Sequence, residues 1–301
     1  MSVFVGLDCG GSSTRVMATD AQGSILFQGQ SGAANIANTP ESRLRRSLSA
    51  ASAGCPAADY VCAGMAGVVN DSTKERATSI LRDIFPGARV RVEPDYTAAY
   101  FACPAGTDIC VISGTGSLVC SQDDDAKQIH RSGGGGYLIG DEGSAFQFGR
   151  DAVRHFLDSP FSASESLSAA IQQLFGTLAP GDIIAEIYRL PAPATILAKL
   201  AKSLITDYRA GEPYALASVD HQMEALARVT RKHIDQFALQ SRGQLKICLA
   251  GGLWKGSGEI QSVFEQKLRG TEPDLLFVIT RIEKPPIHGA LTLAHRMVNP
   301  Q

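Results

Sequence analysis

The sequence predicts an α/β protein of two domains that is built from one duplicated unit. Two stretches about a hundred residues apart, 3–18 and 108–120, share one pattern: an apolar run, a turn of glycines and hydroxyls, and a second apolar run. After the first stretch, strand-like runs alternate with helix-like periods, which is typical of α/β folds. The chain has 301 residues, of which 44% are hydrophobic, enough for two ordinary cores. We therefore place the domains at residues 1–105 and 106–286.

The first turn follows Asp8 directly. It consists of two glycines and three hydroxyl residues: Gly10, Gly11, Ser12, Ser13 and Thr14. Glycine adopts φ > 0 and lets main-chain N–H groups approach an anion, so this turn suits a phosphate. The carboxylate of Asp8 is then placed to hold Mg²⁺ on that phosphate. The alternative is a tight hairpin with an Asx-turn and no ligand.

The second turn repeats this arrangement with Gly114, Thr115 and Gly116. Each copy is followed by a polar turn, at 20–23 and 123–126, and then by a third run that ends in glycine. Self-similarity at a fixed spacing indicates a duplicated unit. Two phosphate-binding turns that face one cleft would form a nucleotide site.

The remainder of the first half alternates helices and strands. Thr39 is expected to cap a helix that begins at Pro40 and ends near residue 53, and Asp71, Ser72 and Thr73 to cap a second helix that ends near residue 85. Strands are predicted at 59–63 and 88–93. Asp95 follows the second of these, at the carboxyl end of a strand, where open α/β sheets bind ligands. Its alternative role is to cap the next helix.

The second half contains a run of four glycines, 133–136, followed by Asp141 and Glu142. Such a run costs backbone entropy and requires either a tight turn or a closely approaching ligand. Because an amphipathic helix follows, helix capping is the alternative role of the two carboxylates.

Residues 164–241 show helical spacing of apolar residues and are expected to form an inserted helical layer. The histidines His155, His221 and His233 have no carboxylate or cysteine at metal-binding spacing, so surface or capping roles are expected for them. A buried strand then leads into Gly251 and Gly252, a turn that lacks the spacing and the Gly-Lys pair of a Walker A loop. A strand at 275–279 and a helix from 287 complete the chain.

Composition argues against several classes of partner. The net charge of −2, from 28 basic and 30 acidic residues, provides no attraction to nucleic acid or to anionic membranes. Seven cysteines, an odd number without a CxxC pair, are expected to be buried thiols in a reducing compartment. No apolar run approaches about 18 residues and no export signal is apparent, so a cytoplasmic location is expected. We also expect a homodimer.

Four motifs, in this order along the chain, carry a family resemblance: GLDCGGSSTR, ISGTGS, GGGGYLIGDEGSA and LAGGLWKGS. With them the chain resembles, from residue 4 to about 294, the BadF/BadG/BcrA/BcrD ATPase family, which contains the N-acetylglucosamine kinases. This family lies within the superfamily of actin-like, sugar-kinase and Hsp70-like ATPases. The resemblance implies a two-domain actin-like fold, a duplicated ribonuclease H-like unit with an inter-domain cleft. It also implies that the helix at 287–301 returns to the first domain.

The resemblance further implies a reaction and a set of site residues. ATP and Mg²⁺ would be the cofactors, with the adenosine at Gly251 and Gly252, and Asp95 would be the base that faces the sugar hydroxyl. The residues that contact the sugar would be Asn35, Asp95, Thr115, Gly134, Gly135 and Asp141. The chain departs from the family at Gly135, where the kinases typically have tryptophan. A roomier sugar pocket would result, and the identity of the sugar stays open.

Three functions compete at this stage. The first is phosphorylation of an amino sugar, N-acetylglucosamine or glucosamine, at the 6-hydroxyl, with N-acetylmuramic acid or another hexose as the alternative substrate. The second is an activator ATPase with an iron–sulfur cluster between two subunits, which needs cysteine ligands at a suitable spacing. The third is a filament-forming or chaperone-like relative of actin that uses ATP as a conformational switch. The Asp95 and Asp141 pair favours the sugar kinase.

Overall fold

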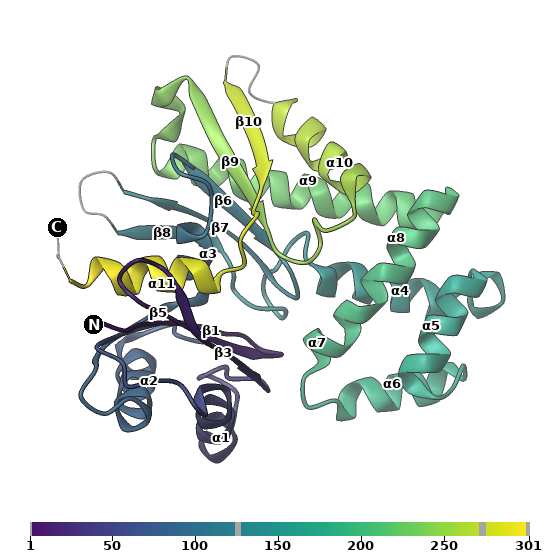
Figure 1. The fold of residues 1–301 in the computed structure, drawn as a ribbon. Helices are drawn as coiled ribbons and strands as arrows, with labels where there is room; N and C mark the ends of the chain where they lie inside the picture. Colours follow the sequence, from purple (N-terminus) through teal and green to yellow (C-terminus); the bar gives the residue numbers. More distant parts are fainter. Residues whose placement is uncertain (1, 124–127, 271–274, 299–301) are drawn as a thin grey trace. The chain divides into compact units, whose positions relative to one another are not determined.

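The computed structural model describes residues 2–123, 128–270 and 275–298, and the chain divides into two compact units. Unit 1 comprises residues 1–105 and 282–301, and unit 2 comprises residues 106–281. The predicted polar turn at 123–126 lies, apart from Asp123, outside the described residues, as do residues 299–301 of the predicted last helix. Figure 1 labels most of the helices and strands of both units.

Unit 1 contains five strands in one sheet. Its elements are β1 (Phe4–Cys9), β2 (Thr14–Thr19), β3 (Ile25–Ser31), α1 (Glu41–Ser52), β4 (Tyr60–Met65), α2 (Asp71–Ile84), β5 (Arg89–Pro94), α3 (Asp95–Phe101) and α11 (Ile287–Arg296). The strand order is β3-β2-β1-β4-β5. The first three strands pair antiparallel, and β4 and β5 continue the sheet in parallel with β1.

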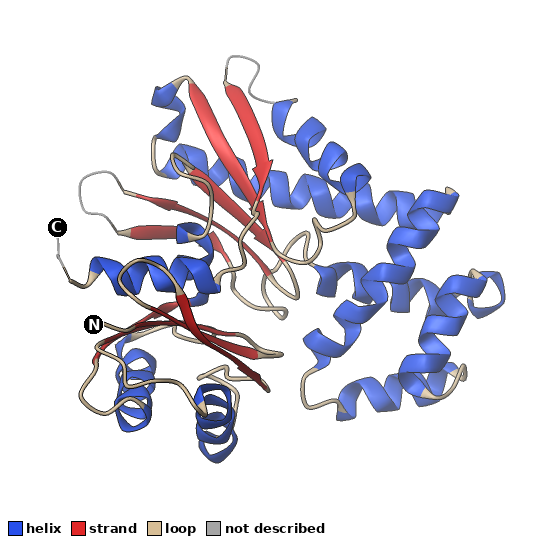
Figure 2. Cartoon of the chain, in the orientation of Figure 1, coloured by secondary structure: helices blue, strands red, loops and turns tan. Residues whose placement is uncertain are grey.

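Strand β1 separates two apolar layers of unit 1, because its side chains alternate between the faces of the sheet. Val5 and Leu7 belong to the core beneath α1 and α2, whereas Phe4 packs with Ile287 and Leu291 of α11 on the other face. Figure 2 shows α1 and α2 below this sheet and α11 above it. A Cβ on Gly6 would lie 2.7 Å from the backbone nitrogen of Leu291, so only glycine lets α11 approach β1 this closely.

Unit 2 repeats the sheet and adds helices. Its elements are β6 (Ile109–Ser113), β7 (Ser117–Gln122), β8 (Ile129–Gly133), α4 (Ala145–Asp158), α5 (Glu165–Phe175), α6 (Pro180–Arg189), α7 (Pro193–Leu197), α8 (Ala201–Ala210), α9 (Pro213–Gln236), β9 (Gln244–Ala250), α10 (Gly258–Arg269) and β10 (Leu276–Arg281). Three short 3-10 helices lie at Pro160–Ser162, Ala198–Leu200 and Leu239–Arg242. The strand order, read from the antiparallel edge, is β8-β7-β6-β9-β10.

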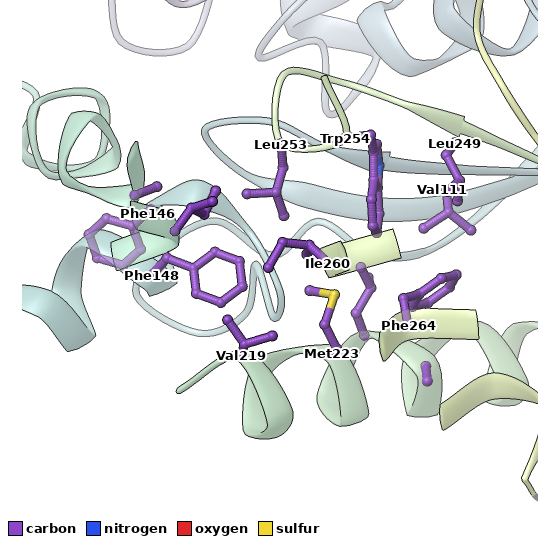
Figure 3. Close-up of a cluster of buried hydrophobic side chains, with 14 of the residues drawn as sticks. Val111, Phe146, Phe148, Val219, Met223, Leu249, Leu253, Trp254, Ile260 and Phe264 are labelled. Atoms are coloured by element: carbon purple, nitrogen blue, oxygen red, sulfur yellow. The ribbon is translucent and has the colours of Figure 1, made fainter. Parts of the chain in front are cut away.

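The core of unit 2 lies between its sheet and helices α4, α9 and α10. In Figure 3, Val219 and Met223 of α9 point toward Ile260 and Phe264 of α10, beneath Trp254. Trp254 is 1% exposed, and its ring centroid lies 5.5 Å from that of Phe264. This core closes within the continuous segment 106–281.

The two sheets have one topology. In each, two antiparallel pairings are followed by two parallel pairings, and the first hairpin carries the glycine turn at its tip. The prediction that one unit is duplicated is therefore confirmed. The predicted strands are all present, with ends that differ from the predicted ones by one or two residues where the structure describes them.

The predicted cap of α1 is wrong, and that of α2 is correct only in part. Helix α1 begins at Glu41 with Pro40 as its N-cap and no side-chain cap, because the Thr39 hydroxyl accepts the N–H of Asn35 instead. Helix α2 has Asn70 as its N-cap, one residue before the predicted segment 71–73, and Thr73 of that segment completes a reciprocal capping box with Asn70. At α2 a polar neighbour takes the role, whereas at α1 the hydroxyl is already used by a main-chain N–H four residues earlier.

Candidate active site

The first glycine turn joins β1 to β2 and is closed by the pairing of Cys9 with Thr14. The Gly10 N–H donates to the Ser13 carbonyl at 2.9 Å, and the Gly10 carbonyl accepts the N–H of Ala34 at 3.0 Å. Among the described residues, the N–H groups of Gly11, Ser12 and Ser13 donate to no protein acceptor. Three adjacent main-chain donors therefore remain for an anion.

The glycines of this turn have ordinary backbone angles, so the expectation of φ > 0 at Gly10 and Gly11 is wrong. A Cβ on Gly11 would meet nothing within 4 Å. The fold itself thus does not require glycine at residue 11. A ligand that approaches the backbone would explain it.

Asp8 lies one residue before the end of β1, and its register partner in β2 is Arg15. The pKa of Asp8 is raised to about 6, chiefly by burial and also by the negative charge of Asp95, while the charge of Arg15 acts in the opposite direction. A carboxyl group in this state gains from a cation beside it. Asp8 and Asp95, which lie 87 positions apart in the sequence, are thus electrostatic neighbours within unit 1.

Asp95 is the first residue of α3, immediately after β5. The N-cap position belongs to Pro94 and the helix has no side-chain cap, so the capping alternative for Asp95 is wrong. Its Oδ1 accepts the N–H of Tyr96 at 3.0 Å, which fixes the carboxylate at the carboxyl end of the strand.

Asn35 lies in the loop that holds the first turn, one residue after Ala34. Its Oδ1 accepts the N–H of Ala37 at 2.9 Å, and a Cβ on Gly67 would lie 2.2 Å from that oxygen. Because the side-chain carbonyl is used in this way, the group that Asn35 has left for a ligand is its amide N–H₂.

The second glycine turn is attached to the start of α4. The carbonyls of Gly114 and Thr115 accept the N–H groups of Ala145 and Phe146, at 2.9 and 3.3 Å. The Gly114 N–H donates to the Gly116 carbonyl, whereas in the described chain the N–H groups of Thr115 and Gly116 have no protein acceptor. The second turn therefore matches the first in offering adjacent unpaired amides.

Asp141 lies directly against this turn. Its Oδ1 accepts the Ser117 N–H at 3.3 Å, and a Cβ on Gly116 would be 2.8 Å from its Oδ2. Asp141 is 7% exposed and has φ = 64°, a left-handed backbone that is uncommon for a residue other than glycine. Burial raises its pKa, and main-chain N–H groups counteract part of that effect. Helix α4 is capped by Ser144, so the capping alternative is wrong for Asp141 as well.

Three of the four consecutive glycines, Gly133, Gly134 and Gly136, have positive φ, which favours glycine there. A hydrogen-bonded turn follows directly, because the Gly136 carbonyl accepts the N–H groups of Ile139 and Gly140. Gly135 does not have positive φ, and a Cβ there would meet Cγ1 of Ile139 at 3.2 Å. Ile139 therefore covers Gly135, the position at which the family resemblance leads us to expect tryptophan. Leu138 and Ile139 are 81% and 84% exposed, which is unusual for large apolar side chains.

The turn at Gly251 and Gly252 packs against the end of β6. Gly251 has φ = 109°, and a Cβ there would lie 2.1 Å from the Ser113 carbonyl oxygen, so glycine is required. The Leu253 N–H donates to the same oxygen at 3.1 Å. Gly252 differs: its φ is ordinary and a Cβ there would meet nothing within 4 Å. Since a Cβ on Gly114 would lie 3.9 Å from the Gly252 nitrogen, this turn is next to the second glycine turn.

Unit 1 thus brings together Asp8, residues 10–14, Asn35 and Asp95, and unit 2 brings together residues 114–116, Asp141 and the turn at Gly251 and Gly252. Sequence reasoning missed Arg15. The hairpin register could have revealed it, because a turn at 10–13 places residue 15 opposite residue 8 in the paired strands. Arg15 is the cation nearest to that carboxylate in the pairing scheme and is exposed.

The histidines take no part in these clusters. A surface or capping role was expected for His233, but its side chain is fully buried, and its two ring nitrogens bond to the hydroxyls of Ser121 and Ser132 at 2.8 Å each. His155 stacks on Tyr214 at 3.8 Å, and His221 is exposed. In the described part of the chain no three His, Cys, Asp or Glu side chains form a metal site by themselves.

A magnesium ion bound to a nucleotide needs only one or two carboxylates and takes its other ligands from phosphate and water. The pair of Asp8 and Asp95, with the raised pKa of Asp8, fits that requirement. No helix among the described residues has the length and hydropathy to span a membrane.

Comparison with known proteins adds the wider context. The model of the BadF/BadG/BcrA/BcrD ATPase family matches residues 5–275. The chain is 23% identical over 308 residues to the N-acetylmuramic acid/N-acetylglucosamine kinase of Clostridium acetobutylicum, covering 98% of both chains. It is 22% identical to the N-acetyl-D-glucosamine kinase of Dictyostelium discoideum, covering 97% of both.

Solved structures agree on the fold. The provisionally named N-acetylglucosamine kinase of Chromobacterium violaceum superposes with a TM-score of 0.73 at 25% identity, covering 98% of this chain and 99% of that one. A ROK family glucokinase of Streptomyces griseus, solved with glucose and AMPPNP, gives 0.62 at 18% identity, with 98% and 100% covered. With the repeated sheets, these likenesses confirm the α/β, actin-like fold.

Proposed function

Because the chain belongs to the BadF/BadG/BcrA/BcrD ATPase family, we propose that it is an ATP-dependent sugar kinase that phosphorylates the 6-hydroxyl of an amino sugar. N-acetylglucosamine or glucosamine is the proposed substrate. The observation that carries the proposal is the pair of glycine turns, each with adjacent main-chain N–H groups that have no protein acceptor in the described structure. Full-length likeness to two curated sugar kinases supports the same reaction.

The groups of unit 1 act on the phosphates and on the attacking hydroxyl. The amides and hydroxyls of residues 10–14 bind phosphate oxygens, and Arg15 adds a positive charge next to Asp8. Asp95 accepts the proton of the sugar hydroxyl while its oxygen forms the new bond to the γ-phosphorus and the bond to the leaving ADP oxygen breaks. Asp8 would hold Mg²⁺, which neutralises charge on the phosphates when it is bound.

The groups of unit 2 bind the remaining parts of both substrates. The amides of Thr115 and Gly116 face a phosphate. The turn at Gly251 and Gly252 has no side chains, so the flat adenine base of ATP lies against its backbone. Asp141 accepts hydrogen bonds from sugar hydroxyls, together with Gly134, Gly135 and the Thr115 side chain. Asn35 contributes from unit 1.

Gly135 bears on which sugar is used. The alternative substrates are N-acetylmuramic acid, whose lactyl ether needs extra room, and a plain hexose. The absence of a ring at residue 135 favours tolerance of larger sugars, whereas Ile139, which covers Gly135, restricts that space. Pocket walls of this kind discriminate by about 10- to 200-fold per missing or added group.

A coupled assay of ADP release tests the function directly. Glucosamine, N-acetylglucosamine, N-acetylmuramic acid, N-acetylmannosamine and glucose are each supplied with ATP and Mg²⁺, and phosphorus NMR identifies the esterified carbon. We expect sugar-dependent release with at least one amino sugar and a 6-phosphate product. ATP hydrolysis at the same rate without any sugar would contradict the kinase and favour the activator ATPase.

The activator ATPase has a second, visible test. Its iron–sulfur cluster needs accessible cysteine ligands, whereas Cys9, Cys62, Cys110, Cys120 and Cys248 are buried. We expect a colourless protein without iron after anaerobic purification.

Two further expectations concern the molecule in the cell. Seven thiols without a disulfide suit the cytoplasm. A homodimer is proposed, and exposed apolar side chains of unit 2 such as Phe161 and Tyr188, at 104% and 87% exposure, are surfaces that a second copy would cover. Sedimentation analysis of the wild type and of Tyr188→Ser measures this.

A further inference from the structure

The loop 133–143 contains the sugar-binding groups proposed for unit 2 other than Thr115, and one helix holds both of its ends. At its end, the Gly143 N–H donates to Oε1 of Gln222 at 3.1 Å, and a Cβ on Gly143 would lie 2.7 Å from Cβ of Leu226. At its start, a Cβ on Gly133 would lie 3.3 Å from Cγ1 of Val229.

The residue before the loop is held by the same helix. Ser132 shares a hydrogen bond of 2.8 Å with Nδ1 of His233, whose Nε2 bonds at the same distance to Ser121 in the neighbouring strand. Gln222, Leu226, Val229 and His233 are spaced by four, three and four positions, which places them on one face of α9. A single helix face thus contacts both ends of the loop.

The hydrogen bond to Gly143 has a fixed direction. Asp151 of α4 accepts Nε2 of Gln222 at 2.9 Å and the Ser218 hydroxyl at 2.8 Å. Because a carboxylate only accepts, it holds the Gln222 amide with its N–H₂ toward α4 and its oxygen toward Gly143. Gln222 is 3% exposed, so water does not readily replace these partners.

The loop has a reason to need such support. Asp141 has φ = 64°, and Gly133, Gly134, Gly136 and Gly143 also have positive φ. A left-handed backbone at a residue other than glycine persists only where its surroundings enforce it. Gly143 is two residues from Asp141, so releasing Gly143 lets Asp141 relax and move its carboxylate away from the Ser117 N–H.

We propose that this face of α9, consisting of Gln222, Leu226, Val229 and His233, positions the loop 133–143 so that Asp141 is held ready for the sugar. Gln222 and His233 are positioning residues, and Asp151 acts through Gln222. The inference rests on the proposed function for its sugar-binding consequence. The mechanical part, that α9 fixes the loop, stands on the contacts alone.

Gln222→Met tests this with a matched control on the same helix. Methionine keeps the length and volume of the side chain but loses both amide hydrogen bonds. Met223→Leu changes a neighbouring residue that points into the core, as Figure 3 shows, and leaves both hydrogen bonds of the Gln222 amide in place. Hydrogen exchange of the amides in 133–143 is measured for both variants, together with KM for the best sugar and for ATP.

In Gln222→Met we expect exchange in the loop to rise about tenfold, the equivalent of about 1.4 kcal/mol, with exchange elsewhere unchanged. The sugar KM should rise by a similar factor and the ATP KM by less than about twofold, whereas Met223→Leu changes neither. Unchanged exchange in the loop overturns the proposal, as does a general rise over all of unit 2 with both KM values altered. Faster exchange with an unchanged sugar KM overturns the positioning role.

If the wild type phosphorylates no sugar, the proposed function fails, and the exchange measurement still decides whether α9 fixes the loop. Asp151→Asn adds a variant of equal size that keeps partners for Ser218 and Gln222 but no longer dictates which way the Gln222 amide faces. We expect it to raise loop exchange by about two- to threefold. No change in Asp151→Asn, with a change in Gln222→Met, removes Asp151 from the proposal.

Discussion

Asp8 is a carboxyl group whose environment opposes its own charge. Its pKa in the folded protein is about 6, against 3.8 for an ordinary aspartate, because of burial and of the nearby Asp95. Between these two values the folded state binds more protons than the unfolded state, so stability falls as the pH rises from about 4 to about 6. Above pH 6 the ionised Asp8 lowers the free energy of unfolding by up to about 3 kcal/mol.

Asp8→Asn is therefore expected to stabilise the protein while abolishing its magnesium-dependent activity. At pH 7.5 and without nucleotide, Tm should rise by a few degrees relative to the wild type, as expected for a gain of 1 to 3 kcal/mol in about 300 residues. At pH 4 the difference should vanish, because the wild-type Asp8 is then protonated. Differential scanning calorimetry at the two pH values provides the measurement, and a variant less stable than the wild type at pH 7.5 would contradict it.

Asp95 is predicted to matter for the rate and not for the fold. In Asp95→Asn, the side-chain oxygen still accepts the Tyr96 N–H, so the start of α3 should be preserved. Loss of the proton acceptor should lower kcat by at least about 10²-fold with little effect on the ATP KM. Glu93→Gln, two residues earlier, changes a partly buried carboxylate that pairs with Arg91 and Lys74; it is the control and should remain active. A nearly wild-type rate for Asp95→Asn would exclude it as the base.

Individual residues also mark the limit of what sequence reasoning reached. The positions of Asp8, Asp95 and Asp141 next to strand ends or glycines could be predicted from the sequence, because strand, turn and helix signals are local. His233 was misjudged because its partners, Ser121 and Ser132, lie about a hundred residues away, and nothing near residue 233 indicates them. Contacts between distant segments decide such cases.

The glycine turns contain two kinds of glycine, those that the fold requires and those that it does not. Gly251 is required by the fold, since a Cβ there would collide with the Ser113 carbonyl. Gly11 and Gly252 have ordinary φ and open space, so the fold does not require them. The sequence predicted both turns but not this distinction, which depends on how each turn packs against other segments.

Alanine substitutions should separate the two kinds. Gly11→Ala and Gly252→Ala are expected to fold with Tm within a few degrees of the wild type and to raise the ATP KM by about tenfold or more, because the methyl group occupies the place of the nucleotide. Gly181→Ala, also with ordinary φ and open space but in α6, should leave the ATP KM unchanged and add slight stability. Unchanged ATP KM values in both turn variants would exclude these turns from the nucleotide site.

Each of the two units has a core of its own, and the spectroscopic signals that follow their unfolding differ. The chain has one tryptophan, Trp254, and it lies in the core of unit 2. Tryptophan fluorescence therefore follows the unfolding of unit 2, whereas far-UV circular dichroism follows both units. Coincidence of the two signals is the standard test for a single transition.

We expect Asp8→Asn, in unit 1, to move the urea midpoint measured by circular dichroism and to leave the Trp254 midpoint in place. Because each core closes within its own unit, stability gained in unit 1 should not pass in full to unit 2. Equal shifts of both midpoints would show that the two units unfold as one.

The duplicated architecture was predictable because the sequence pattern occurs twice: each copy has a hairpin with a glycine turn, and strands follow in the same order. What the sequence alone did not indicate is how closely α11 approaches β1. That approach depends on Gly6, and the approach of α11 to α3 depends on Gly289, since a Cβ on Gly289 would lie 1.9 Å from the Ala98 carbonyl oxygen. Neither glycine has a side chain that shows in a hydrophobic pattern.

The return of α11 to unit 1 also sets an order of events on the ribosome. Residues 106–281 are contiguous, so unit 2 has all of its core as soon as that segment has emerged. The sheet of unit 1, although its strands are translated first, keeps Phe4, Met17 and Cys62 uncovered until Ile287 and Leu291 follow. Domains commonly complete their folding in the order of synthesis. Here the nascent chain is expected to reverse that order, with the first sheet held open to solvent and to chaperones while the second unit is already closed.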